Sequence, residues 1–154
     1  MVVLVGCGFH LRGSGNLSSI KGPVFVSTDA FSEVADELRR TLEYSEIALS
    51  KNAELANLTA TITREDFTRR TVSVDDANNT RGVELRYSVH LKVTRTDSEY
   101  AQTEVLETER EYEFDSGGVL GSADEEDLLL EEMRGHLVRT ILNHLTLASR
   151  EISE

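Results

Sequence analysis

The residues that could carry acid–base, nucleophilic or metal chemistry are few in this sequence and do not gather in a recognisable pattern. The four histidines are His10, His90, His136 and His144. Glu132 and His136 have the i, i+4 spacing that places two ligands on one helical face, but no second histidine stands beside them, and a solvent-exposed pair is the simpler interpretation. No G-x-S-x-G motif, Cys–His dyad or phosphate-binding glycine loop occurs. The sequence therefore predicts neither an enzyme nor a metal or cofactor site.

The single cysteine, Cys7, is the most informative reactive group because of the residues that precede it. An apolar run leads into Gly6, and the stretch Leu4-Val5-Gly6-Cys7 resembles the lipobox of bacterial lipoproteins. In that motif the thiol receives a diacylglycerol, the chain is cut before the cysteine, and the new N-terminus is acylated. Three acyl chains, at roughly 0.8 kcal/mol per buried CH₂, would make an anchor that scarcely dissociates. The alternative is a short buried strand with a core cysteine, since unpaired cysteines are often buried.

Charge is unevenly distributed along the chain. The net charge of −12 argues against nucleic acid as the main partner. Between residues 64 and 95 seven basic residues stand against five acidic ones, so this segment carries +2 and the rest of the chain −14. Such a segment can meet an anionic ligand, and the alternative is a solvated sheet face whose charges happen to be basic. The seven residues are Arg64, Arg69, Arg70, Arg81, Arg86, Lys92 and Arg95.

The elements that must position these groups begin with a tether, a strand and a helix. Residues 14–22 are rich in serine, glycine and asparagine and indicate a tether. The apolar run Val24–Val26 predicts a short strand. A helix is expected over residues 31–44, with Asp29 or Ser32 as its N-cap. Its apolar stripe consists of Phe31, Val34, Ala35, Leu38 and Leu42.

Three strands follow. Leu58, Ala60 and Ile62 alternate with threonines, and Phe67 is out of phase with them, which predicts a bulge. The polar turn at residues 75–82 contains Asn78, Asn79 and Gly82, which suit positive φ. Strict alternation from residue 83 to residue 94 predicts an antiparallel strand with one buried and one wet face, and a fourth strand is expected over residues 106–114.

A long helix completes the chain. Its N-cap is expected near Ser122 or Asp124, which would place Asp124, Glu125, Glu126 and Asp127 in a first turn that favours negative charge. Its apolar stripe consists of Leu130, Met133, Leu137, Val138, Ile141, Leu142, Leu145 and Ala148. The order β-α-β-β-β-α predicts an α+β fold: a two-layer sandwich in which two helices cover one face of a four-stranded, mainly antiparallel sheet.

Two parts of the sequence carry a family resemblance. The opening Cys7-Gly8-Phe9-His10-Leu11-Arg12-Gly13 resembles the start of the mature chain in the LptE family of lipopolysaccharide-assembly lipoproteins. Further along, Phe114-Asp115, Glu125-Glu126 and Leu130-Glu131-Glu132-Met133-Arg134 are similar to the family's approach into its last helix. The predicted element order also matches the LptE fold, so the resemblance covers essentially the whole chain.

The resemblance implies a non-enzymatic outer-membrane lipoprotein that faces the periplasm. Such proteins plug LptD, a large outer-membrane β-barrel, assist its assembly, and bind lipopolysaccharide on its way to the surface. Contacts to lipopolysaccharide phosphates are expected near the turn between the second and third strands and before the last helix. The resemblance thus points to Arg81 in the turn and to Arg69 and Arg70 on the preceding strand, since guanidinium groups bind phosphate bidentately. At the second position residues 121–124 contain no basic side chain, which departs from the family pattern.

The expected organisation is a signal-peptide remnant at residues 1–6, a lipidated N-terminus and tether at residues 7–22, and a single LptE-like domain at residues 23–154. Gly8 follows the cysteine, which is compatible with delivery to the outer membrane. One alternative function is a generic outer-membrane lipoprotein scaffold that does not bind lipopolysaccharide. Another is a small periplasmic hydrolase, which requires a convergent cluster of titratable residues that the sequence does not present.

Overall fold

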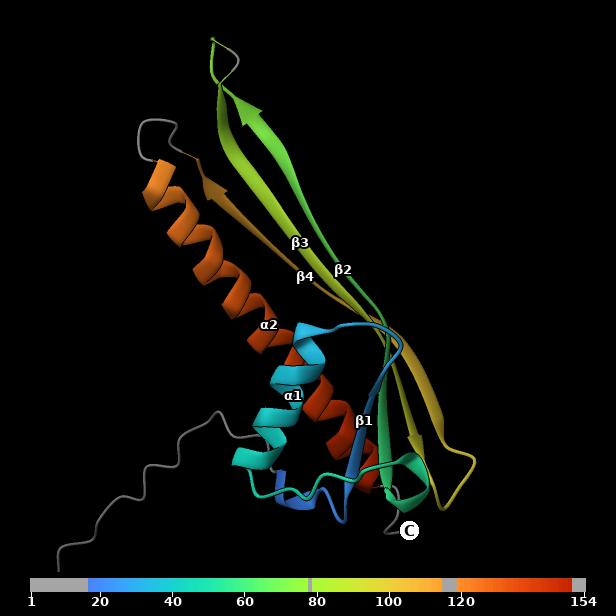
Figure 1. The fold of residues 1–154 in the computed structure, drawn as a ribbon. Helices are drawn as coiled ribbons and strands as arrows, with labels where there is room; N and C mark the ends of the chain where they lie inside the picture. Colours follow the sequence, from blue (N-terminus) through green and yellow to red (C-terminus); the bar gives the residue numbers. More distant parts are fainter. Residues whose placement is uncertain (1–16, 78, 115–118, 151–154) are drawn as a thin grey trace, which may run out of the picture.

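The computed structural model describes residues 17–77, 79–114 and 119–150 (Figure 1). Four strands and two helices follow one another in the order β-α-β-β-β-α, as the sequence predicts. The strands are β1 (Val24–Thr28), β2 (Leu58–Val74), β3 (Thr80–Arg95) and β4 (Ala101–Glu113), and the helices are α1 (Glu33–Tyr44) and α2 (Val119–Arg150). Short 3-10 turns occur at Leu17–Ser19 and Ala53–Leu55.

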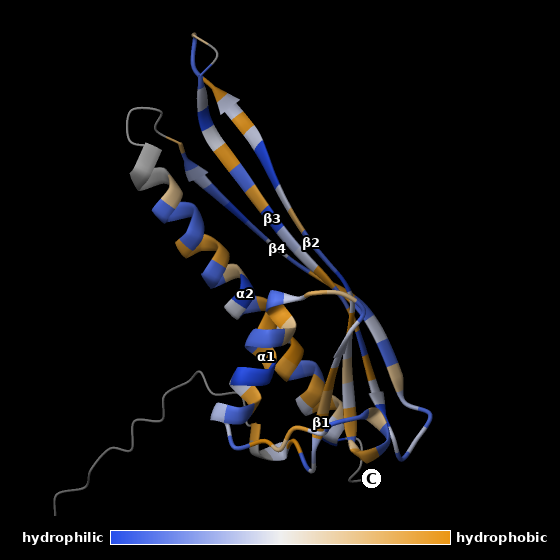
Figure 2. Cartoon of the chain, viewed as in Figure 1, coloured by the Kyte–Doolittle hydropathy of each residue, from blue (hydrophilic) through white to orange (hydrophobic). Residues whose placement is uncertain are grey.

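The strands form one sheet in the order β1-β2-β3-β4. Strand β1 runs parallel to β2, whereas the β2–β3 and β3–β4 pairs are antiparallel. Both helices lie on the same face, so the predicted two-layer α+β sandwich is confirmed, and the sheet is mixed only through β1. Apolar residues collect where the two helices meet that face (Figure 2).

Strand β2 contains the predicted bulge. Its register against β3 shifts between Ile62 and Arg64, so Thr63 is the extra residue. The shift reverses which residues face the helices: Ala60 and Ile62 do so before it, and Glu65 and Phe67 after it, with Phe67 packed edge-on against Tyr87. The change of parity seen in the sequence is therefore a real change of face.

The turn after β2 corrects one expectation. Asn79 and Gly82 do not have positive φ, whereas Gly22 and Glu46 do, and Asn78 lies outside the described residues. Gly82 instead lies where a Cβ atom would stand 2.5 Å from the Ser73 Oγ atom. Glycine is favoured at this position because a side chain would crowd those of Ser73 and Val72, and not because the backbone is left-handed.

Helix α1 begins later than its apolar spacing suggests. Ser32 is the N-cap, and its Oγ atom accepts a hydrogen bond from the Ala35 N–H at 2.9 Å. The stripe from Val34 to Leu42 is buried, but Phe31 precedes the cap and is 82% exposed. Its expected place in the core is therefore wrong, because the chain has not yet entered the helix at Phe31.

Helix α2 begins at Val119, before the expected caps at Ser122 and Asp124. The acidic residues from Asp124 to Asp127 consequently lie beyond the first turn. The predicted stripe is confirmed from Met133 to Ala148, where every member is buried, while Leu130 is partly buried. The long helix α2 runs along the sheet, and α1 packs against the C-terminal part of α2 (Figure 1).

Residues 17–22, which the sequence places in the tether, pack against the end of α2. Ile20 belongs to the core. The Ser149 Oγ atom donates to the Ser19 carbonyl at 2.7 Å and accepts from the Lys21 N–H at 3.1 Å. Cys7 and residues 14–16 lie outside the described residues. Within the described chain, neither helix has an apolar stretch long enough to span a bilayer.

Candidate functional site

The three arginines to which the sequence points lie at the outer end of the β2–β3 hairpin, the end farthest from β1 (Figure 1). The structure does not bring them together. Arg69 and Arg70 are neighbours on one strand, so their side chains leave on opposite faces of the sheet. Arg81 stands at the start of β3.

Arg69 faces the helices and joins β2 to α2. Its Nε donates to the Glu126 Oε2 atom at 2.9 Å, one Nη donates to the Tyr112 hydroxyl at 3.3 Å, and its guanidinium lies 5.7 Å from the ring centre of Phe114. Tyr112 also donates a hydrogen bond to Glu126. Partial burial acts to raise the pKa of Glu126, but the bonds from Tyr112 and Arg69 outweigh it, so that pKa is lowered. Arg69 is thus a structural contact that holds β2 to α2.

Arg70 lies on the opposite, helix-free face, where it binds Glu84 with two hydrogen bonds of 2.7 and 2.9 Å. The bidentate contact from Arg70 lowers the pKa of Glu84. Glu84 is only 5% exposed, which corrects the expectation of a wet side chain at this position. Arg86 adds a bond of 2.8 Å to Glu109 and a longer ion pair of 3.9 Å to Glu84, so this face is a network of alternating charges.

Arg81 is the least constrained of the three. Its side chain is 54% exposed and forms an ion pair of 3.2 Å with Asp75 in the turn. Hydrogen bonds from the Asn79 backbone and side chain lower the pKa of Asp75, so this carboxylate stays charged beside Arg81. The backbone of Arg81 is fixed because its carbonyl accepts from the Phe114 N–H at 2.8 Å. A rigid backbone with an exposed guanidinium can receive an anion from solvent.

Two groupings of side chains in the described residues have the chemistry of metal ligands. Glu84, Glu109 and Glu111 offer carboxylate oxygens within 4.8 Å of one another. Arg70 and Arg86 already neutralise two of these carboxylates, as the bonds above show. The Glu132–His136 pair is not assembled for metal binding either, because Glu132 turns to Arg110 of β4 at 3.2 Å and His136 is exposed.

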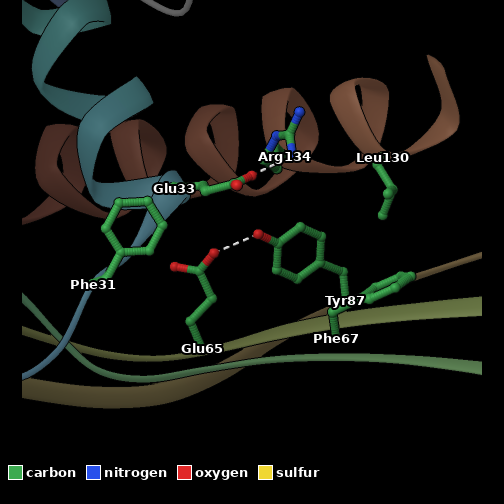
Figure 3. Close-up of a pocket in the computed structure, with 7 residues that line it drawn as sticks. All are labelled: Phe31, Glu33, Glu65, Phe67, Tyr87, Leu130 and Arg134. Atoms are coloured by element: carbon green, nitrogen blue, oxygen red, sulfur yellow. Dashed lines mark hydrogen bonds and ion pairs between the residues drawn. The ribbon is translucent and has the colours of Figure 1, made fainter. Parts of the chain in front are cut away.

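Sequence reasoning did not find a cleft between α1, α2 and β2 (Figure 3). It encloses about 330 Å³ and is lined by Phe31, Glu33, Glu65, Phe67, Tyr87, Leu130 and Arg134. Glu65 lies on the strand side of the cleft, where it accepts hydrogen bonds from the Ser32 and Tyr87 hydroxyls, and Arg134 pairs with Glu33 on the helix side. Burial, reinforced by Glu65, raises the pKa of Tyr87, so this phenol stays protonated as a donor. The only sequence signal for the cleft was the bulge that the parity of Phe67 predicts, because helical spacing assigns Phe31 to the core.

The chain is similar to one known protein family and to several solved structures. The model of the family described as LptE: Lipopolysaccharide-assembly matches residues 19–145. The crystal structure of rare lipoprotein B from Shewanella oneidensis is similar with a TM-score of 0.73 and 22% identity, over 86% of this chain and 99% of that one. The solution structure of lipoprotein B from Nitrosomonas europaea gives a TM-score of 0.77 and 22% identity, over 94% of each chain.

A third similar structure is a minor lipoprotein from Acinetobacter baumannii, with a TM-score of 0.63 and 16% identity, over 82% of this chain and 91% of that one. None of the curated proteins matches the chain. At these identities the solved structures establish the fold, and the match to the family model extends over most of the domain.

Proposed function

Because the chain belongs to the LptE family of lipopolysaccharide assembly, we propose that it is an outer-membrane lipoprotein that plugs an LptD-like β-barrel and assists its assembly. It acts there without catalysis and takes part in the transport of lipopolysaccharide to the cell surface. The match over residues 19–145 is the observation that carries this function. The proposal is supported by the helix-free sheet face, which is a charged network, since the interior of such a barrel is polar.

Cys7 is the proposed lipid attachment site. The stretch Leu4-Val5-Gly6-Cys7 supplies the thiol and the small neighbouring residue that lipidation requires. A lipid anchor holds the domain at the periplasmic side of the outer membrane, and it raises the effective concentration near the barrel, so modest protein contacts suffice. Residues 17–22 pack against α2, so the described chain is held to the domain from its first turn onward.

Lipopolysaccharide is the proposed anionic ligand, and Arg81 is its proposed main phosphate contact. The side chain of Arg81 is more than half exposed and is held by one ion pair of 3.2 Å. Arg70 is also largely exposed, at 66%, but it is bound bidentately by Glu84 on the other face from Arg69. Arg69 and Arg70 therefore bind a phosphate only after they release their carboxylate partners. Arg81 needs the smallest rearrangement of the three.

One experiment tests the membrane and barrel parts of the proposal. The tagged full-length chain is expressed in a Gram-negative host, extracted from the envelope with detergent, purified and analysed by mass spectrometry. We expect acyl chains on Cys7 and a large outer-membrane β-barrel in the purified complex. A Cys7→Ser chain should lose the lipid because its hydroxyl cannot form the thioether. Recovery of only soluble or inner-membrane partners contradicts the function, and lipidation without a barrel supports a general scaffold instead.

A second experiment tests lipopolysaccharide binding. We expect Arg81→Gln to weaken the binding of purified lipopolysaccharide in surface plasmon resonance about tenfold, because hydrogen bonds to charged groups contribute roughly 1.5–3 kcal/mol. Arg139→Gln, on the exposed side of α2, is the control and should bind like the parent chain. Equal affinities for Arg81→Gln and Arg139→Gln contradict the assignment of Arg81.

A further inference from the structure

One edge of β2 is left without a partner strand. Strand β1 covers only Leu58–Ile62 of β2, because it ends at Thr28 and the chain turns away toward α1. Within residues 17–77, 79–114 and 119–150, no segment pairs with that side of β2 between Arg64 and Thr71. On the other side the same eight residues pair with β3 without a register shift. This stretch, called here the free edge, is therefore regular backbone with roughly half of its donors and acceptors available.

The cleft of Figure 3 opens beside the free edge. Glu65 and Phe67 belong to both features. A neighbouring cavity of about 500 Å³ continues the cleft between α1 and α2 and shares Phe31, Glu33 and Arg134 with it. Together the two cavities are lined by five carboxylates and two arginines, so the site is acidic. The charged residues are Glu33, Asp36, Glu37, Glu65, Glu131, Arg40 and Arg134.

Aromatic rings frame the same site. Phe31 is 82% exposed and Phe67 is 42% exposed, and both rings line the cleft. Their exposure leaves apolar surface in water at one place on the molecule. A ring face next to carboxylates attracts cations through its quadrupole as well as through the nearby charge. The chemistry of the cleft therefore favours a basic side chain with an aliphatic stem, and not an acidic or purely apolar one.

We propose that the free edge and the cleft form one docking site for an extended, basic segment of a partner protein. The segment adds a strand beside Arg64–Thr71, in line with β1, and inserts a lysine or arginine side chain between Phe31 and Phe67 toward Glu65. In this mode backbone hydrogen bonds supply affinity, and a pocket for one side chain supplies specificity. Two of the proposed phosphate contacts, Arg69 and Arg70, lie within the free edge, but none of the three arginines lines the cleft that receives the basic side chain.

The test uses a fluorescent nine-residue peptide in which threonine and valine alternate around one central lysine. The full chain should bind this peptide, and binding should slow amide hydrogen exchange within Arg64–Thr71, since newly paired N–H groups become protected. A peptide with a central glutamate should bind at least about tenfold more weakly because the cleft is acidic. The lysine peptide N-methylated at alternate residues along its pairing edge should lose binding to a similar extent.

Variants of the protein separate the cleft from general surface effects. Phe31→Ala should weaken the lysine peptide about tenfold, as truncation of an interface anchor does. Its exposure means that the fold loses little. Tyr44→Ala is the matched control, because Tyr44 is an aromatic residue that is 89% exposed at the end of α1 but lies outside the cleft. Glu33→Gln should reduce the ratio between the affinities for the lysine peptide and the glutamate peptide, because it removes one negative charge from the cleft.

Several results overturn the proposal. These are equal binding of the lysine and glutamate peptides, retained binding of the N-methylated peptide, equal effects of Phe31→Ala and Tyr44→Ala, and unprotected amides in Arg64–Thr71. A dimer in sedimentation that disappears in Phe31→Ala assigns the edge to a second copy of the chain, and also overturns it. None of these outcomes bears on the LptE-family function, which the envelope experiment tests separately.

Discussion

Arg69 and Arg70 are adjacent in the chain, but their guanidinium groups serve opposite faces of the sheet. Arg69 joins β2 to α2 through Glu126, and Arg70 covers the buried carboxylate of Glu84. The sequence predicts the basic segment and its strand, but it could not predict these partners. The contact to Glu126 depends on the approach of α2, and the Arg70↔Glu84 pairing depends on the register after the bulge. Arg81 is the one of the three whose exposure follows from its place next to a turn.

The Arg70–Glu84 pair gives a prediction about pH. The pKa of Glu84 is lowered in the folded protein because Arg70 binds its carboxylate. A lowered folded pKa stabilises the protein above the unfolded pKa of about 4.3, and this contribution is lost as pH falls through the folded pKa. We expect Arg70→Gln to have a lower free energy of unfolding at neutral pH and a shallower decrease on acidification. Urea denaturation from neutral pH to about pH 3 measures both.

Arg139→Gln is the control for this pH series, since Arg139 is exposed on α2 and away from Glu84. It should retain the stability and the pH dependence of the parent chain. If Arg70→Gln and the parent lose stability in parallel as pH falls, Arg70 is not the cause of the lowered pKa of Glu84.

At the scale of elements, the bulge at Thr63 and the N-cap of α1 act together. The bulge turns Glu65 toward the helices, where it accepts a hydrogen bond from Ser32, and Ser32 in turn caps α1. The sequence predicts the bulge from the parity of Phe67 and includes Ser32 among the possible caps. It could not predict the cleft, because helical spacing alone also assigns Phe31 to the core. Only the position of the cap excludes Phe31.

Ser32→Ala tests this junction. We expect the free energy of unfolding to fall by about 1 kcal/mol, within the range of roughly 0.5–2 kcal/mol for loss of an N-cap. Urea denaturation measures the loss. Ser45→Ala at the other end of α1 is the control, because Ser45 caps the helix through its backbone N–H. Equal effects of the two substitutions contradict a capping role for the Ser32 side chain.

At the scale of the whole molecule, α2 is the element that unites the fold. Its 32 residues extend along β3 and β4 and also pack against α1 and the turn at Leu17–Ser19. Its apolar stripe is predictable because the spacing continues over several turns. Its start at Val119 is not, because Ser122 and Asp124 are both good caps in sequence and the helix begins before either.

Substitutions along α2 should reflect this arrangement. We expect Leu137→Ala to cost about 2–5 kcal/mol of unfolding free energy, since it opens a cavity at a residue that is 1% exposed. Leu147→Ala, on the same helix and 55% exposed, should change stability by less than about 0.5 kcal/mol. Thermal and urea unfolding measure both variants. A large effect of Leu147→Ala would show that a further contact covers this side of the helix.

The contact between residues 17–22 and the end of α2 fixes the end of the domain from which a lipid anchor on Cys7 would extend. From Leu58, beside that contact, β2 runs 17 residues to Val74, a span of roughly 50 Å. The ten peptide units that join Cys7 to Leu17 reach at most about 36 Å. A lipid on Cys7 therefore cannot draw the hairpin tip down to its own point of attachment. With a lipid on Cys7, Arg81 at the far end of the hairpin would therefore stay apart from the lipidated residue itself, whatever the tilt of the domain.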